Sequence, residues 1–229
     1  MRLIRSITPP LIFATTCALI ETTEYLLDFE FHFLGLQPGE RRGILGIFLH
    51  PFLHGDIQHL VSNMVSFVFL CSSIIFFFPA ISRKVILSIY IITGVGVWFL
   101  GRSNAVHIGA SGEIYGFAAF LFFFGIFRNN PSSLVISLII ALLYNGMLYG
   151  ILPAQPGVSW ESHLMGGFSG LIVAYYFRNY QTEAFQHITT KVEDIIFEGY
   201  ENIETEQYKY TFVSKEASKK KHQPPKPSQ

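Results

Sequence analysis

Charged side chains are scarce in this sequence. Asp, Glu, Lys and Arg make up 14% of the 229 residues, against roughly 25% in soluble domains. Half of these charges lie from position 178 onward, so the body of the chain carries very few. The net charge is zero and gives no sign of a nucleic-acid partner. We therefore expect an apolar, membrane-embedded body that is followed by a charged tail.

Cysteine is also scarce, and histidine is scattered. Cys17 and Cys71 both lie in apolar stretches, so the sequence indicates neither a disulfide framework nor a thiolate metal site. His50 and His54 fit the HxxxH spacing of the first histidine box in membrane di-iron enzymes. No second box follows among the eight histidines, so we expect neither a metal nor any other cofactor.

Long apolar runs are abundant, and each is close to the roughly 17–25 residues that span a bilayer as a helix. They predict an all-α, polytopic membrane bundle of six transmembrane helices. The first run is interrupted by Glu21 and Glu24, and a signal peptide that begins at Arg2 and Arg5 is the alternative; no small-residue cleavage pattern supports it. The six runs are residues 9–28, 57–78, 84–101, 109–127, 133–152 and 162–178.

Basic residues in the short loops predict the orientation. If the N-terminus lies inside, six basic residues flank the inner ends of the spans and three lie in outer loops, which favours N-in and C-in. We expect residues 1–178 to form the membrane domain and residues 179–229 to form a cytoplasmic tail, with an amphipathic helix followed by disorder. The inner residues are Arg2, Arg5, Arg83, Lys84, Arg128 and Arg178; the outer ones are Arg41, Arg42 and Arg102.

The parity of the spans brings polar residues to one depth. Spans two, four and six run in the same direction, so their N-terminal ends share one level near the outer face. Ser111 begins the fourth span, His163 begins the sixth, and His59 and Asn63 lie in the first turns of the second. At 1.5 Å per residue, all four lie within about two turns of the boundary. Polar groups that gather at one level in a membrane predict a functional site.

These residue types suit serine chemistry. A serine hydroxyl needs a base, and histidine is suited to that task near neutral pH. Backbone N–H groups at a helix N-terminus can bind an oxyanion. Glu113 and Glu161 lie two residues from Ser111 and His163, so helical geometry directs both carboxylates away and predicts a Ser–His dyad. His107 is a rival base, which we expect to be a solvent-exposed loop residue instead.

Two small-residue ridges bracket the dyad. Gly112 and Gly116 follow the serine, and Gly166 and Gly170 follow the histidine. Such ridges let helices approach closely in lipid. They fit bundle packing alone, but they also predict that the two helices bring Ser111 and His163 together.

Three motifs in this order resemble the rhomboid family of intramembrane serine proteases, over about residues 9–178. An isolated GxSG is a weak signal, but the ordered set is a specific one. The motifs are Gly109-Ala110-Ser111-Gly112 with Tyr115, Ser162-His163-Leu164-Met165-Gly166 with Gly170, and His59-Leu60-Val61-Ser62-Asn63.

The resemblance implies a role for each matching position. Ser111 would be the nucleophile and His163 the general base, with Tyr115 packed against the histidine ring. His59, Asn63 and the Ser111 backbone N–H would form the oxyanion hole.

Other positions match structural parts of the family or depart from it. The turn of Gly109 and Ala110 would support the oxyanion hole, and His50 and His54 match histidines to which the resemblance assigns a structural role. Many rhomboids carry a Trp-Arg pair where this chain has Leu45-Gly46, which puts the anchoring of the first loop in doubt.

We therefore expect a serine endopeptidase that cleaves single-span membrane proteins in or near their membrane-spanning segment. The site would open toward the outer side of a bacterial inner membrane, with the lipid bilayer as its surroundings. The alternatives are a catalytically silent rhomboid-like binding factor and a transporter.

Overall fold

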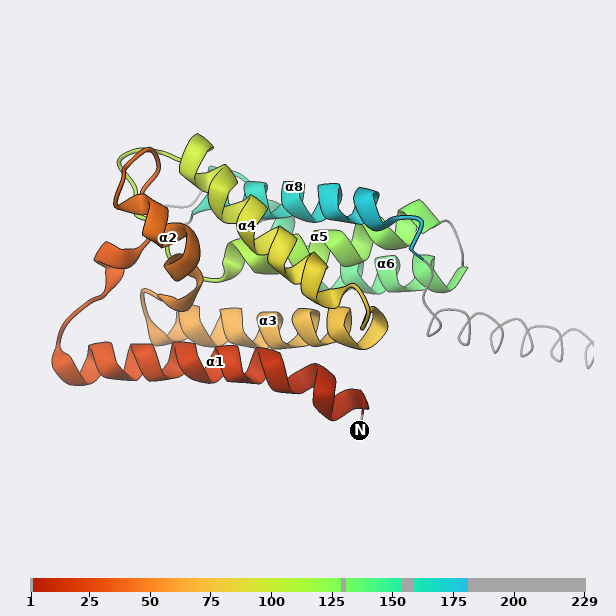
Figure 1. Cartoon of the computed structure of the whole chain (residues 1–229), viewed down its shortest axis with the longest axis horizontal. Coiled ribbons are helices and arrows are strands. Elements are labelled where there is room, and N and C mark those ends of the chain that lie inside the picture. The colour runs from red at the N-terminus through yellow and green to blue at the C-terminus, as the bar shows by residue number, and fades with distance from the viewer. Residues whose placement is uncertain (1, 129–130, 154–158, 181–229) are drawn as a thin grey trace, which may run out of the picture. The chain divides into compact units, whose positions relative to one another are not determined.

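The computed structural model describes residues 2–128, 131–153 and 159–180 (Figure 1). Within these ranges the named elements are all helices, and an isolated β-bridge pairs Leu36 with His107. The all-helical prediction is therefore confirmed for this part of the chain. The helices are α1 (Arg2–Leu27), α2 (Gly43–Leu49), α3 (Ile57–Phe77), α4 (Ser82–Leu100), α5 (Ser111–Arg128), α6 (Pro131–Leu143), α7 (Met147–Gly150) and α8 (Trp160–Phe177), with 3-10 turns η1 (His32–Leu34) and η2 (His50–Phe52).

The chain divides into two units, residues 1–187 and 188–229. The second unit lies outside the described residues. So do the amphipathic helix and the disordered end that we predict for the tail.

Four of the described helices, α1, α3, α4 and α5, are long and apolar enough to cross a membrane. α8 has 18 residues, but its first turns contain Glu161, Ser162 and His163, which lower its hydropathy. The first predicted run is one helix that begins at Arg2. Length and composition thus support four of the six predicted spans.

The prediction of one continuous fifth helix over 133–152 is wrong. α6 ends at Leu143, and α7 begins at Met147. Between them, the Asn145 side-chain amide donates to the Leu142 carbonyl oxygen at 2.7 Å. Asparagine competes for backbone hydrogen bonds in this way, and the following Gly146 is a poor helix former. The interruption turns the chain toward the site described below.

α5 is the central helix of the first unit, and it contacts α3, α4, α6 and α8. Phe117, Phe120 and Phe124 of α5 are buried, and Phe124 packs edge-on against Phe78 with ring centroids 4.8 Å apart. Phenylalanine side chains of α5, together with Phe78, therefore supply much of the core.

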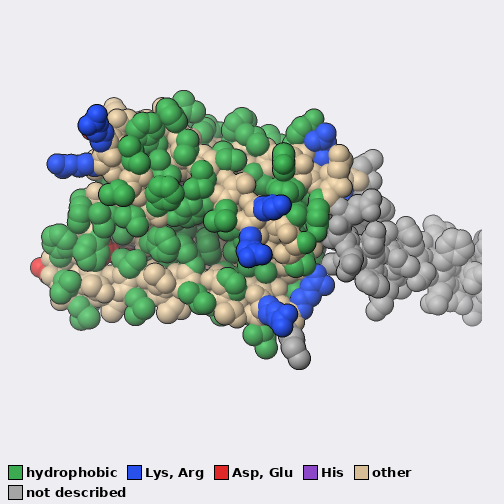
Figure 2. Space-filling model, viewed as in Figure 1, with side chains coloured by type: hydrophobic (Ala, Val, Ile, Leu, Met, Phe, Trp, Pro, Cys, Tyr) green, Lys and Arg blue, Asp and Glu red, His purple; other side chains and the backbone are tan. Residues whose placement is uncertain are grey.

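Apolar side chains also cover the outside. Leu19, Val65 and Leu87 are each more than half exposed, as expected of helices whose outer faces contact lipid. Figure 2 shows hydrophobic side chains over much of this face, with Lys and Arg near the left edge and over the right-hand part.

The two predicted glycine ridges meet where α5 crosses α8. A Cβ added at Gly166 would lie 1.9 Å from the Gly112 carbonyl oxygen, and one at Gly170 would lie 2.2 Å from that of Gly116. No side chain fits in either place. The helices approach closely enough for their first turns to share a site.

Gly46 in α2 stands where many rhomboids carry the arginine of the Trp-Arg pair. A Cβ on Gly46 would lie 2.3 Å from the Leu36 Cα, so this position has no room for the arginine that many rhomboids carry. The loop is held instead by backbone contacts, among them two hydrogen bonds of 2.9 and 2.8 Å between Leu36 and His107.

Candidate active site

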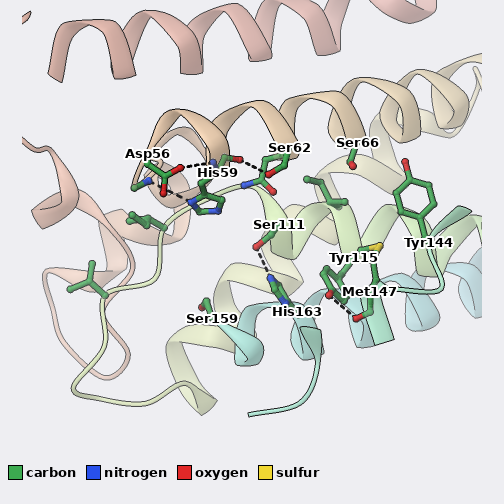
Figure 3. A pocket seen from close by; sticks show the side chains of 15 residues that line it. Asp56, His59, Ser62, Ser66, Ser111, Tyr115, Tyr144, Met147, Ser159 and His163 are labelled. Atoms are coloured by element: carbon green, nitrogen blue, oxygen red, sulfur yellow. Dashed lines mark hydrogen bonds between the residues drawn. The ribbon is translucent and has the colours of Figure 1, made fainter. Parts of the chain in front are cut away.

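Ser111 and His163 lie at hydrogen-bond distance at the first turns of α5 and α8. The Ser111 hydroxyl donates to His163 Nε2 over 2.8 Å. Both line a cavity of about 590 Å³, which His59, Asn63 and Tyr115 also line. Figure 3 shows His163 pointing across at Ser111, with His59 on the opposite wall. The structure thus gathers in one cavity the polar side chains that the sequence predicts at one depth.

The tautomer of His163 follows from its second hydrogen bond. Nδ1 lies 2.8 Å from the carbonyl oxygen of Gly150, at the end of α7. A carbonyl oxygen only accepts, so Nδ1 carries the proton and Nε2 presents its lone pair to the serine. This is the protonation state that a general base requires.

Tyr115 holds the other face of the imidazole. Its ring stacks on His163 with centroids 4.2 Å apart and planes 8° apart. The Tyr115 hydroxyl donates to the Met147 carbonyl oxygen at 2.7 Å (Figure 3). A Cβ on Gly150 would lie 2.0 Å from that hydroxyl and 3.0 Å from His163 Nδ1. α7 therefore clamps both rings through main-chain carbonyls, and Gly150 fits only as glycine.

The helix that supplies the opposite wall is fixed by a cap. Asp56 has an extended backbone and its carboxylate accepts from the His59 N–H at 2.7 Å, as N-cap residues do. One turn further along α3, Asn63 is buried and its amide nitrogen has no hydrogen-bond partner within the described residues. A donor that is buried without a partner is costly, and here it borders the cavity.

The turn before Ser111 brings the backbone against this wall. Gly109 has φ +98°, a conformation that favours glycine. A Cβ there would lie 2.8 Å from the His59 ring and 3.3 Å from Asn63 Nδ2. Ala110, which follows, is fully buried. Backbone N–H groups at the start of α5, Asn63 and His59 thus surround one region beside the Ser111 hydroxyl.

His107 is not the exposed loop residue that the sequence suggests, because only 1% of it is exposed. Its Nδ1 bonds to the Ser159 hydroxyl and lies 3.4 Å from that of Ser162. Burial lowers the pKa of His107 to about 4. The segment that begins α8 covers the His107 ring. The burial of His107 therefore depends on tertiary packing, which the composition of the loop does not reveal. His107 supports the start of α8 and has no described bond to Ser111.

The two nearby carboxylates are engaged elsewhere, as predicted. The Arg102 guanidinium donates to both carboxylate oxygens of Glu161, from Nε to Oε1 and from Nη2 to Oε2, the latter at 3.2 Å. Glu113 Oε1 lies 3.4 Å from His50 Nε2. Neither is a hydrogen-bond partner of His163 in the described residues. There, too, no group of three or more His, Cys, Asp or Glu side chains is arranged to hold a metal.

Sequence reasoning missed the acceptor role of α7. The Asn145-Gly146 pair inside the fifth run is the signal that could have revealed it, because it marks a helix interruption. The ion pair between Arg102 and Glu161 was missed as well. Its signal in the sequence is that two side chains of opposite charge lie at the same predicted depth, one before the fourth span and one before the sixth.

Comparison with known proteins agrees with this geometry. A family model described as the Rhomboid domain matches residues 41–180. Uncharacterized proteins from Mycobacterium bovis and Mycobacterium tuberculosis are each 33% identical over 175 residues, which cover 72% of this chain and 72% of the relative. An uncharacterized protein from Mycobacterium leprae is 30% identical over 72% of this chain and 68% of its own length. Together with the apolar helices, these matches show that the chain is an integral membrane protein that belongs to the rhomboid family.

Proposed function

We propose that this protein is a serine endopeptidase that cleaves other membrane proteins in or beside their membrane-spanning segments. The observation that carries the proposal is the oriented dyad: Ser111 Oγ lies 2.8 Å from His163 Nε2, while Nδ1 is bonded to the Gly150 carbonyl. A hydroxyl so placed can lose its proton to the ring as it attacks a carbonyl carbon.

The proposed hydrolysis has two stages, acylation of Ser111 and hydrolysis of the acyl-enzyme. Ser111 Oγ bonds to the scissile carbonyl carbon, its proton moves to His163 Nε2, and the carbonyl oxygen becomes an oxyanion. Collapse breaks the C–N bond, and the imidazolium gives its proton to the leaving amine. Water then attacks the acyl-enzyme, with His163 again as base, and releases the acid and the free serine.

The oxyanion would be stabilised from the α3 wall. The Asn63 amide, which has no hydrogen-bond partner in the described part of the chain, borders the cavity beside the Gly109 turn. The first N–H groups of α5 lack intrahelical acceptors. Donors of this kind typically lower the barrier by about 2.7–4 kcal/mol each. His59 lines the same wall and would assist as a further donor.

The substrate class follows from the surroundings of the cavity. Two helices that line it, α3 and α5, are long and apolar enough to cross a membrane. A peptide bond inside an intact helix is shielded from attack. We propose single-span membrane proteins as substrates, with small or helix-breaking residues near the cut. We further propose N-in/C-in topology in a bacterial inner membrane, with the cavity open to the outer side; the surplus of basic residues at the inner ends supports this orientation.

An active-site probe tests the proposal. A fluorophosphonate should label the wild-type protein and leave Ser111→Ala unlabelled, and only the wild type should cleave single-span substrates in proteoliposomes. Ser73→Ala is the matched control, because its hydroxyl bonds only within α3, to the Phe69 carbonyl at 2.8 Å. Labelling of Ser111→Ala equal to the wild type would refute the proposal in favour of a binding factor. Solute flux that Ser111→Ala leaves intact would instead indicate a transporter.

A second pair of variants tests the base. Cleavage should be lost in His163→Ala, because no other imidazole lies at hydrogen-bond distance from Ser111 in the described residues. His107→Ala should retain cleavage in the folded fraction. The reverse result would overturn the assignment of the base.

A further inference from the structure

A buried acid–base pair that the proposed mechanism does not use lies directly beneath the serine turn. Glu113 is fully buried in the first turn of α5, and His50 is 1% exposed in η2. Glu113 Oε1 lies 3.4 Å from His50 Nε2, and neither carboxylate oxygen has a hydrogen-bond partner in the described residues. A buried carboxylate with so few partners is costly to keep, so its presence requires an explanation.

The hydrogen bond at Nδ1 orients the His50 ring so that Nε2 faces the Glu113 carboxyl. His50 Nδ1 lies 2.8 Å from the Gly46 carbonyl oxygen, which only accepts, so Nδ1 carries a hydrogen. The opposite ring nitrogen, Nε2, lies 3.4 Å from Glu113 Oε1. This contact joins α5 to η2.

The same histidine holds the turn that precedes the serine. The His50 carbonyl oxygen accepts from the Gly109 N–H at 2.9 Å. Gly109 in turn lies against His59 and Asn63, where a Cβ would already collide. His50 is thus held by hydrogen bonds to Gly46 of α2 at Nδ1 and to Gly109 at its carbonyl, and its Nε2 contacts Glu113 at 3.4 Å.

We propose that Glu113 is a positioning residue for the catalytic site. Through His50, it fixes the Gly109 turn against the α3 wall, and so sets the distance between the oxyanion donors and the Ser111 hydroxyl. This inference rests on the proposed function, because it concerns the geometry of the same reaction. Donors that act on an oxyanion contribute in the transition state, so their displacement lowers kcat more than it changes KM.

Two substitutions of similar size separate positioning from simple stabilisation. Glu113→Gln keeps a polar contact, because its amide can donate to the lone pair of a neutral His50. Glu113→Leu removes the contact and fills the space with apolar atoms, but it leaves the buried His50 ring without this partner, so we expect it to melt at a lower temperature than wild type. We expect kcat to fall at least about tenfold in Glu113→Leu, with KM within about twofold, and to recover to within about threefold of wild type in Glu113→Gln.

The measurement is kcat and KM on a single-span substrate in proteoliposomes, normalised to the amount of protein that elutes as a folded, monodisperse species, with the melting temperature in detergent as the measure of folding. Glu30→Leu, at a side chain that is 79% exposed, is the control and should match wild type. Glu113→Leu with wild-type kcat would overturn the inference, even if it melts lower. Equal losses in the Gln and Leu variants would do the same. Absence of Ser111-dependent labelling in the wild type would instead refute the proposed protease itself.

Discussion

Gly150→Ala offers a sharp test of the dyad, because the substitution acts on the base without changing either member. A Cβ at this position would lie 2.0 Å from the Tyr115 hydroxyl, whereas ordinary contact begins near 3.4 Å. The difference of about 1.4 Å must be absorbed by α7 or by Tyr115. If α7 moves, the bond from His163 Nδ1 to the Gly150 carbonyl, now 2.8 Å, is strained or lost; if Tyr115 moves, its ring leaves the stacked position that holds the His163 imidazole.

The expected loss follows from the size of this displacement. A misplacement of about 1 Å in a catalytic group typically costs about 10²-fold in rate, which corresponds to about 2.7 kcal/mol in the activation barrier. We expect kcat to fall about 100-fold in Gly150→Ala. The melting temperature should change little, because α7 is short and lies at the margin of the core.

The assay is single-turnover cleavage in proteoliposomes, together with the rate of fluorophosphonate labelling. Gly167→Ala is the control: it lies four residues after His163 in α8, and a Cβ there meets no atom within 4 Å. Adding Tyr115→Phe should partly rescue Gly150→Ala, because the nearest remaining ring atom, Cζ, is 3.2 Å from the Cβ. A Gly150→Ala enzyme within twofold of wild type would refute the role given to the carbonyl.

Three further predictions concern packing, backbone and pH. Gly166→Ala places a Cβ 1.9 Å from the Gly112 carbonyl oxygen and should destabilise the α5–α8 contact by about 1–3 kcal/mol in thermal unfolding, whereas Gly167→Ala, which meets no atom within 4 Å, should not. Gly109→Ala, at φ +98°, should abolish fluorophosphonate labelling in protein that still purifies as a folded species; normal labelling would contradict the turn geometry. Burial lowers the pKa of His107 from 6.5 to about 4, so this ring contributes stability that is complete above pH 6.5 and is lost as the pH falls toward 4, because the unfolded chain takes up the proton first. The melting temperature should fall as the pH is lowered from 6.5 to 4, and it should fall less in His107→Gln. The same pH dependence in both proteins would exclude His107 as the cause.

Apart from the fifth run, the sequence predicts where the long helices lie, because their positions depend on local composition and length. The parity of the predicted spans singles out Ser111 and His163, whose side chains lie 2.8 Å apart. The glycine ridges that bring them together also follow from spacing alone. Such features need no knowledge of how loops fold.

The acceptors in α7 could not be predicted in this way. In an uninterrupted helix over 133–152, the Met147 carbonyl would bond to the backbone amide four residues later, and the Gly150 carbonyl would be one of the last four, which have no intrahelical partner. Both carbonyls accept from Tyr115 and His163 because the helix breaks at Asn145-Gly146 and α7 begins separately. The burial of His107 was missed for a similar reason, since it depends on where the start of α8 packs.

The Gly150 carbonyl also affects how easily protons move through the site. In a Ser–His–Asp triad, a carboxylate stabilises the imidazolium that forms during acylation. Here the ring has a neutral dipole as its Nδ1 partner, which stabilises that cation less. We expect His163 to take the serine proton less readily than a triad histidine and to surrender it to the leaving amine more readily. The arrangement therefore shifts the demanding part of the reaction toward the initial attack, and it makes departure of the amine comparatively easy.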